Sequence, residues 1–93
     1  MTSAIETRVE RIRAALLTAL APSALEVIDD SQAHAGHVGA LTGKGHFRVL
    51  IVAPCFVDIA PLQRHRMIYS ALDALMNSDI HALSIDARAP EQA

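Results

Sequence analysis

The sequence has very little cysteine and few aromatic side chains. Its single cysteine, Cys55, excludes a disulfide within the chain and a four-thiolate metal site built by this chain alone. Aromatic residues make up 3% of the chain, although hydrophobic residues make up 52%. We therefore expect a protein of a reducing compartment with an aliphatic core, which depends on several layers closing over one another.

Long apolar runs and a general excess of positive charge are also missing. No apolar run approaches the roughly 20 residues that span a bilayer, and the first residues, with Glu6 and Glu10 in an amphipathic pattern, do not resemble a targeting peptide. These features predict a soluble, cytoplasmic protein. The net charge of −2 and the pI near 6.2 argue against a generic polyanion binder, although the arginines of the first helix leave room for a local patch.

The length and the hydrophobic periodicity predict one domain over residues 1–93. The expected elements are a helix capped by Thr2 or Ser3 and ending near Leu20, strands over 25–28 and 46–52, a helix from Pro61 to about Met76, a strand over 80–87 and a final turn after Ala89. This order, αββαβ with a short final α, predicts an α+β fold in which a three-stranded sheet has helices packed on one face.

The helix from Pro61 carries a wide apolar stripe, which we expect to cover the sheet. The stripe consists of Leu62, His65, Ile68, Tyr69, Leu72 and Leu75. Within it, His65 reads as a core histidine that a backbone group satisfies. Arg64 and Arg66 are expected on its two flanks, where their stems cover the rim of the core or their guanidinium groups meet phosphate or carboxylate.

The segment 31–46 holds all four glycines and three of the five histidines, and we expect an exposed, mobile loop. His34 and His37 lie three residues apart in it, and imidazole is a ligand for iron, zinc or copper. Without a neighbouring carboxylate or thiolate, the pair is a weak metal signal by itself, and the alternative is a solvated polar loop. If the loop folds across the start of the last strand, His34 or His37 could approach His81 and form a partial metal site whose thiolates come from elsewhere.

Catalytic motifs are absent from the sequence. Cys55 has no adjacent base, and Gly43-Lys44-Gly45 is too short for a phosphate-binding loop and precedes a strand. The sequence contains no Gly-x-Ser-x-Gly and no Cys-x-x-Cys motif. We therefore expect a protein that is not an enzyme.

The chain resembles the BolA-like proteins over nearly its full length. The resemblance lies in LEVIDDS at 25–31, HAGH at 34–37, HFRVLIV at 46–52, PLQRHRMIY at 61–69 and IHALSIDARAP at 80–90. It implies a fold similar to the class II KH arrangement. Two departures stand out: Asp58 occupies a position where the family usually has glycine, and the chain ends at Ala93, soon after the residues that usually open a last helix.

The resemblance also implies a function. BolA-like proteins pair with monothiol glutaredoxins and share a [2Fe-2S] cluster, to which the glutaredoxin and glutathione give thiolates, in iron–sulfur cluster assembly and trafficking or iron-status regulation. By resemblance, His81 is the invariant ligand and His34 the loop ligand of a histidine-type member, with His37 as a neighbour that could substitute. The alternative is a DNA-binding transcriptional regulator, in which Arg64, Arg66 and Lys44 would contact phosphate.

Overall fold

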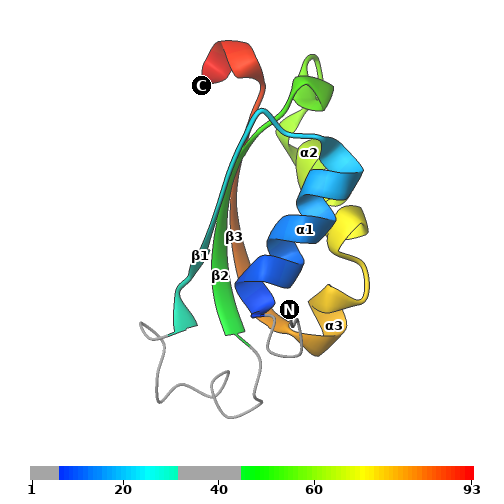
Figure 1. Cartoon of the computed structure of the whole chain (residues 1–93). Coiled ribbons are helices and arrows are strands. Elements are labelled where there is room, and N and C mark those ends of the chain that lie inside the picture. The colour runs from blue at the N-terminus through cyan, green and yellow to red at the C-terminus, as the bar shows by residue number, and fades with distance from the viewer. Residues whose placement is uncertain (1–6, 32–44) are drawn as a thin grey trace.

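A computed structural model describes residues 7–31 and 45–93 and shows a three-stranded sheet with helices on one face (Figure 1). The main elements are α1 (Arg8–Leu20), β1 (Ala24–Asp29), β2 (Gly45–Val52), α2 (Pro61–Leu72), α3 (Leu75–Ser78) and β3 (Ile80–Arg88). Two short 3-10 turns, η4 (Pro54–Phe56) and η5 (Pro90–Gln92), follow β2 and β3. The predicted α+β class and the αββαβ order are therefore confirmed.

The sheet is mixed, with the strand order β1-β2-β3. β1 runs antiparallel to β2, whereas β3 runs parallel to β2 because α2 and α3 carry the chain back across the sheet. This connection determines which strand ends lie together beside the candidate site. The end of β1 and the starts of β2 and β3 lie at the same end of the sheet, while η4 and η5 lie at the opposite end (Figure 1).

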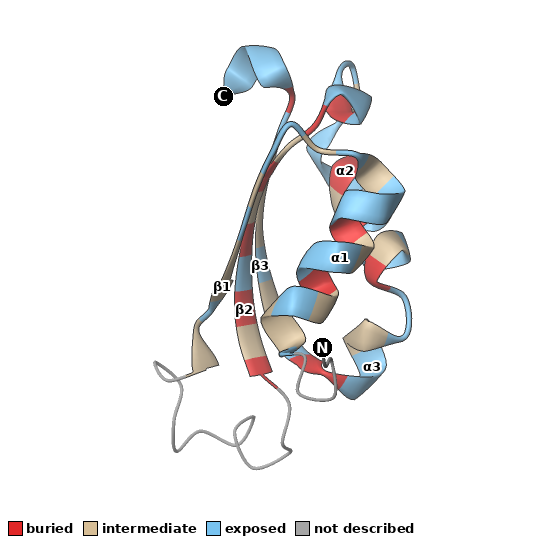
Figure 2. Ribbon diagram, viewed as in Figure 1, coloured by how far each residue is buried: buried red, intermediate tan, exposed pale blue. Residues whose placement is uncertain are grey.

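The core lies between the sheet and the helices α1 and α2, where Figure 2 shows the buried residues on facing surfaces. Alternate residues of β2 are buried, as expected for a strand with one covered face. The buried hydrophobic residues of the described chain are Ile12, Leu16, Phe47, Val49, Ile51, Ala53, Phe56, Ile68, Leu72, Ile80 and Ala89. The predicted aliphatic core is thus confirmed, with both phenylalanines added to it.

The first helix begins later than the sequence pattern suggested. Thr7 caps α1: its hydroxyl accepts a hydrogen bond from the Glu10 amide at 3.1 Å, and the Glu10 carboxylate accepts one from the Thr7 amide at 2.9 Å. This reciprocal pair is a capping box, which satisfies amides that have no partner within the helix. The predicted cap at Thr2 or Ser3, both outside the described residues, is wrong because the Thr-x-x-Glu pattern at 7–10 determines the start.

The buried face of α2 also differs from the predicted stripe. Leu62 and Tyr69 are 64% and 42% exposed, whereas Arg64 is only 7% exposed and lies in line with the buried Ile68 and Leu72. His65 is half-buried. The predicted stripe was centred on the wrong side because Arg64 was counted as polar. Its position four residues before Ile68 places it on the same helix face as the buried Ile68 and Leu72.

The long helix predicted to reach Met76 ends at Leu72. Asp73 has φ 45° and ψ −117°, a conformation that a helix cannot continue through, and α3 starts only after it. Asp58 has φ 62°, so the residue that stands where BolA-like proteins usually have glycine occupies the left-handed region. Both positions therefore carry backbone strain that glycine would not.

Replacing either aspartate with glycine should stabilise the protein. We expect Asp73→Gly to raise the free energy of unfolding by about 1 kcal/mol and Asp58→Gly by about 0.5 kcal/mol, because aspartate tolerates the left-handed region better than the conformation of Asp73. Urea denaturation measures both values. Asn77→Gly, at an exposed helical position without a positive φ, is the control and should not raise stability. A loss of stability in Asp73→Gly would contradict the strain argument.

Candidate metal centre

His81 is the second residue of β3 and is exposed. Gly45 pairs with Ile80 and His46 with Ala82, so the register shifts between these pairs and His81 is the additional residue of a bulge. The rings of His46 and His81 lie with their centroids 5.1 Å apart and their planes inclined by 50°. The fold thus brings two imidazoles from neighbouring parallel strands together, with the exposed His81 as the ring that a partner can reach.

His46 was not among the site residues predicted from the sequence. Its position near the start of β2 was known, but its distance from His81 depends on the parallel pairing of β2 and β3 and on the register shift. A bulge re-aims the side chain of the additional residue, and bulges occur frequently beside functional sites. No signal in the linear sequence predicts this register.

The other predicted site residues of the loop, His34, His37 and Lys44, lie outside the described residues. The described chain shows where their segment is attached. The Ser31 hydroxyl accepts a hydrogen bond from the His46 amide at 3.1 Å, and the Gly45 amide donates to the carbonyl of Asp79 at 2.9 Å. Ser31 is therefore held at the start of β2, and Gly45 joins the start of β2 to the residue before β3. His34 is three residues from Ser31 in the sequence, and three residues of fully extended chain span about 11 Å.

Gly45 is required by close packing at this end of the sheet. A Cβ atom there would lie 2.6 Å from the Phe47 ring and 2.9 Å from the Ser31 hydroxyl oxygen. Real Cβ atoms do not approach neighbours this closely, so any larger residue would displace the core ring or the start of β2. The glycine thus lets β2 begin directly against the residues that precede His81.

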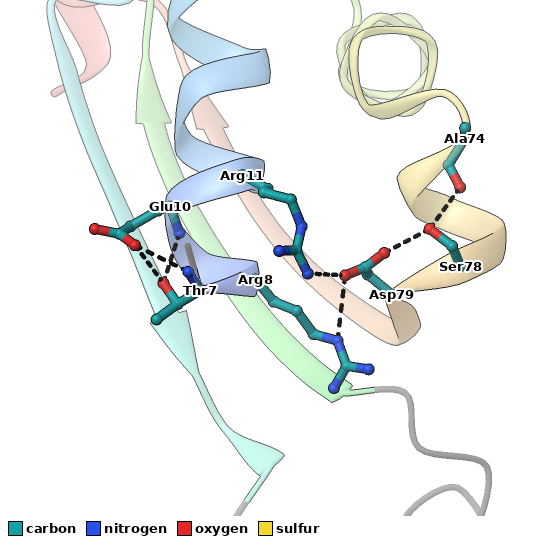
Figure 3. A network of polar contacts seen from close by, with 7 residues as sticks. All are labelled: Thr7, Arg8, Glu10, Arg11, Ala74, Ser78 and Asp79. Carbon is teal, nitrogen blue, oxygen red and sulfur yellow. Dashed lines mark hydrogen bonds and ion pairs between the residues drawn. The ribbon is translucent and has the colours of Figure 1, made fainter. Parts of the chain in front are cut away.

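Asp79, directly before β3, is the centre of a polar network that joins α1 to the start of that strand (Figure 3). The Arg8 Nε atom donates to Asp79 Oδ2 at 3.2 Å, Arg11 donates to the same oxygen, and the Ser78 hydroxyl donates to Oδ1. The Asp79 side chain is 12% exposed and those of the two arginines 39% and 38%. The hydrogen bond from Ser78 and the guanidinium of Arg11 lower the pKa of Asp79 below its ordinary value of 3.8.

The Asp79 network should make the stability of the protein depend on pH. Because the pKa of Asp79 is lower in the folded chain, its stabilising effect is present above pH 3.8 and is lost as the pH falls through the lowered value. We expect Asp79→Asn to cost about 1 kcal/mol near neutral pH, a figure reduced by the partial exposure of the arginines. Urea denaturation of both proteins at a series of pH values should show the difference shrinking as the pH falls below 3.8. A constant difference would contradict this assignment.

Arg64, proposed from the sequence as a phosphate contact, is buried and has protein partners for its guanidinium. It donates to the carbonyl oxygens of Ile59 at 2.7 Å and Ala87 at 3.0 Å, and to the side chain of Gln92 at 2.7 Å. Its guanidinium carbon also lies 5.8 Å from the centre of the Phe56 ring. The predicted flanking position is therefore wrong: Arg64 joins α2, β3 and η5, and its donors point into the protein.

The BolA-like protein family model matches residues 16–92 of this sequence. The chain belongs to the BolA-like family. BolA-like protein 1 of Mus musculus is 43% identical over 81 residues, which cover 87% of this chain and 57% of the mouse protein. The DNA-binding transcriptional regulator BolA of Escherichia coli is 40% identical over 76 residues, 82% of this chain and 70% of that protein. The chain thus spans little more than half the length of its mouse relative.

Solved BolA structures agree with this fold. The BolA domain of SufE1 from Arabidopsis thaliana superposes with a TM-score of 0.82 at 41% identity, covering 97% of this chain and 100% of that domain. BolA1 from the same plant gives a TM-score of 0.81 at 34% identity, with 96% and 99% covered. The resemblance seen in the sequence is therefore confirmed for the family and for the α+β fold.

The place where this BolA-like protein works in the cell stays a prediction. Within residues 7–31 and 45–93, no helix is long and apolar enough to cross a membrane. The names of two relatives from Arabidopsis thaliana include the words chloroplastic and chloroplastic/mitochondrial. Relatives thus carry organelle names, and the cytoplasm remains our expectation from the sequence.

The described imidazole pair and the thiol lie at opposite ends of this BolA-like fold. Among the described residues, no group of three or more His, Cys, Asp or Glu side chains could hold a metal ion. Cys55 is exposed and follows the far end of β2, where its sulfur lies 3.7 Å from the Leu20 carbonyl oxygen. The described chain therefore offers imidazole at one end of the sheet and its thiol at the other, which fits a centre whose thiolates belong to another molecule.

Proposed function

We propose that this chain is the partner of a monothiol glutaredoxin and supplies histidine ligands to a [2Fe-2S] cluster that the two proteins share, in iron–sulfur cluster assembly and trafficking or in iron-status regulation. The observation that supports this most is the exposed imidazole of His81, placed against His46 where the segment 32–44 is attached to the fold. His34 is the proposed second ligand, with His37 as its substitute. The glutaredoxin and its glutathione provide the thiolates, and the chain has no catalytic role.

The chemistry of imidazole decides what this chain adds to such a centre. When bound, a histidine-ligated [2Fe-2S] cluster has a higher reduction potential than one held by thiolates alone. A ligating imidazole must be neutral, so coordination through His81 should weaken at acid pH. The separation of Cys55 from His81 along the whole length of β2 supports a division of ligands between two molecules.

Mixing the chain with a cluster-loaded monothiol glutaredoxin tests the proposal. We expect the visible circular dichroism of the mixture to differ from the sum of the separate proteins, because exchange of a ligand changes the asymmetry around the cluster. Repeating the titration with His34→Ala and His37→Ala separates the two loop candidates, since only the true ligand should lower the amplitude. A spectrum equal to the sum at all ratios would reject the proposal.

DNA binding is the second candidate function, which the name of the Escherichia coli relative suggests. In this chain, Arg66 is exposed and has a 3.4 Å contact to Gln63, so it remains available for phosphate. Lys44 lies outside the described residues. Two further exposed arginines on the sheet are already paired: Arg48 with Asp30 and Arg88 with Asp86, each at 2.9 Å. The described surface therefore offers a DNA backbone little uncompensated positive charge.

A fluorescence titration of labelled DNA at two salt concentrations distinguishes the two functions. If the glutaredoxin proposal describes the main role, salt-sensitive binding tighter than about micromolar should be absent. If tight binding is observed, Arg66→Ala and Lys44→Ala should each lower the slope of log binding constant against log salt concentration by about one. An unchanged slope would show that these residues do not contact the DNA backbone.

A further inference from the structure

Asp79 is the residue through which three parts of the fold meet just before His81. We propose that Asp79 is a positioning residue: it sets the place of the His81 imidazole relative to the end of the loop at Gly45. This inference rests on the proposed function, because it concerns how His81 is presented to a shared metal centre. It adds a role for a side chain that is not itself a ligand.

The side chain of Asp79 is held at both of its oxygens. Arg8 and Arg11, one turn apart on α1, donate to Oδ2, and the Ser78 hydroxyl donates to Oδ1 and contacts the Ala74 carbonyl oxygen at 3.2 Å (Figure 3). A carboxylate engaged at both oxygens from two directions cannot rotate without losing charged hydrogen bonds. The network therefore fixes Asp79 between α1 and α3.

The main chain of Asp79 is held as well. Its amide donates to the Leu75 carbonyl oxygen at 3.0 Å, and its carbonyl accepts from the Gly45 amide at 2.9 Å. Ile80, which follows, is 3% exposed and pairs with Gly45. The end of α3, the start of β2 and the start of β3 are thus joined at one residue, and His81 comes directly after this fixed segment.

The placement of the two arginines supports a dedicated role for this carboxylate. Arg8 and Arg11 lie in the first turn of α1, where the helix dipole favours negative rather than positive side chains. The Asp79 carboxylate, at the α3–β3 junction, balances the positive charge of both arginines and the positive end of the α1 helix dipole. This junction begins the strand that carries His81, so the contact of Asp79 with Arg8 and Arg11 also fixes His81 before a partner binds. A residue that is already fixed loses less conformational entropy on binding.

Two variants test the positioning role, with one matched control and one milder variant beside them. Asp79→Asn keeps the shape and the main-chain contacts but loses the charge, and the double change Arg8→Gln with Arg11→Gln removes the opposite side of the same contact. Asp86→Asn is the matched control, because Asp86 lies on the same strand and forms an exposed ion pair with Arg88. Arg11→Gln alone serves as a milder variant if Asp79→Asn does not fold.

Two measurements are made on each variant. In the free chain, the nuclear Overhauser contact between the His46 and His81 rings should weaken in Asp79→Asn and in the double arginine variant, but not in Asp86→Asn. In the mixture with cluster-loaded glutaredoxin, the titration followed by visible circular dichroism should show roughly ten-fold weaker association for the same two variants. Folded fractions are matched first by far-ultraviolet circular dichroism.

The outcomes separate this inference from the proposed function. If the wild-type chain changes the glutaredoxin spectrum and Asp79→Asn does so equally well with an intact ring contact, the positioning role is overturned. If the wild-type chain leaves the spectrum unchanged, the proposed function fails and the cluster part of this inference fails with it. Loss of the ring contact in Asp79→Asn but not in Asp86→Asn supports the positioning of His81 in either case.

Discussion

His81→Ala should abolish the change in visible circular dichroism that the wild-type chain produces on mixing with a cluster-loaded monothiol glutaredoxin. Ligand loss removes a whole metal–nitrogen bond, and the described chain has no thiolate at that end of the sheet to replace it. We expect at least about a hundred-fold loss of apparent affinity, more than the 10–100-fold typical of residues that only orient a ligand. The exposure of His81 means that the fold itself should tolerate the change.

His65→Ala is the matched control for this experiment. It removes a half-buried imidazole from α2, away from the start of β3, and we have assigned it no metal. The control should give the wild-type spectrum at the wild-type ratio once the folded fractions are equal. An effect of His65→Ala as large as that of His81→Ala would show that the loss reflects general destabilisation. A normal spectrum for His81→Ala would remove this histidine from the shared centre.

Arg64→Ala should have the largest effect on stability among the variants considered. The change leaves the carbonyl oxygens of Ile59 and Ala87 without their donor, removes the contact with Gln92 and opens space beside Phe56. An unsatisfied acceptor costs about 1–3 kcal/mol when buried, and these contacts are partly buried, so we expect the three losses together to lower the free energy of unfolding by about 3 kcal/mol. For a chain of this length, the midpoint of thermal unfolding should fall by at least about 10 °C.

Arg66→Ala is the control for Arg64, since it changes a neighbouring exposed arginine on the same helix. Its effect on urea or thermal unfolding should stay within about 0.5 kcal/mol. Arg64→Lys restores the charge but lacks the planar fork that reaches several acceptors, so it should recover only part of the loss. If Arg64→Ala and Arg66→Ala were equally stable, the hydrogen bonds of Arg64 would contribute no net stability to the fold.

Sequence patterns predicted local structure well where short-range chemistry decides it. Hydrophobic periodicity was sufficient to place the three strands to within a residue or two. The Thr-x-x-Glu capping box at 7–10 was present in the sequence and could have placed the start of α1 correctly. These features depend on backbone preferences and on side chains three or four residues apart.

Other features depended on contacts between distant segments. Periodicity placed Arg64 on the rim, because a helical wheel does not contain the carbonyl groups that satisfy a buried guanidinium. The predicted extension of α2 to Met76 missed Asp73, whose φ of 45° ends the helix. The contact of Asp79 with α1 was not predicted, since its partners Arg8 and Arg11 are about seventy positions away in the sequence.

By itself, the sequence determined the α+β class and the order of the elements, because hydrophobic periodicity is a local property. It named His81 as a candidate ligand through the resemblance to the BolA-like proteins. Only the tertiary structure decided that His46 lies beside His81, that Arg64 is buried and that Asp79 joins α1 to β3. The reason is physical: strand register and burial follow from how all the layers pack at once, and no window of neighbouring residues contains that information.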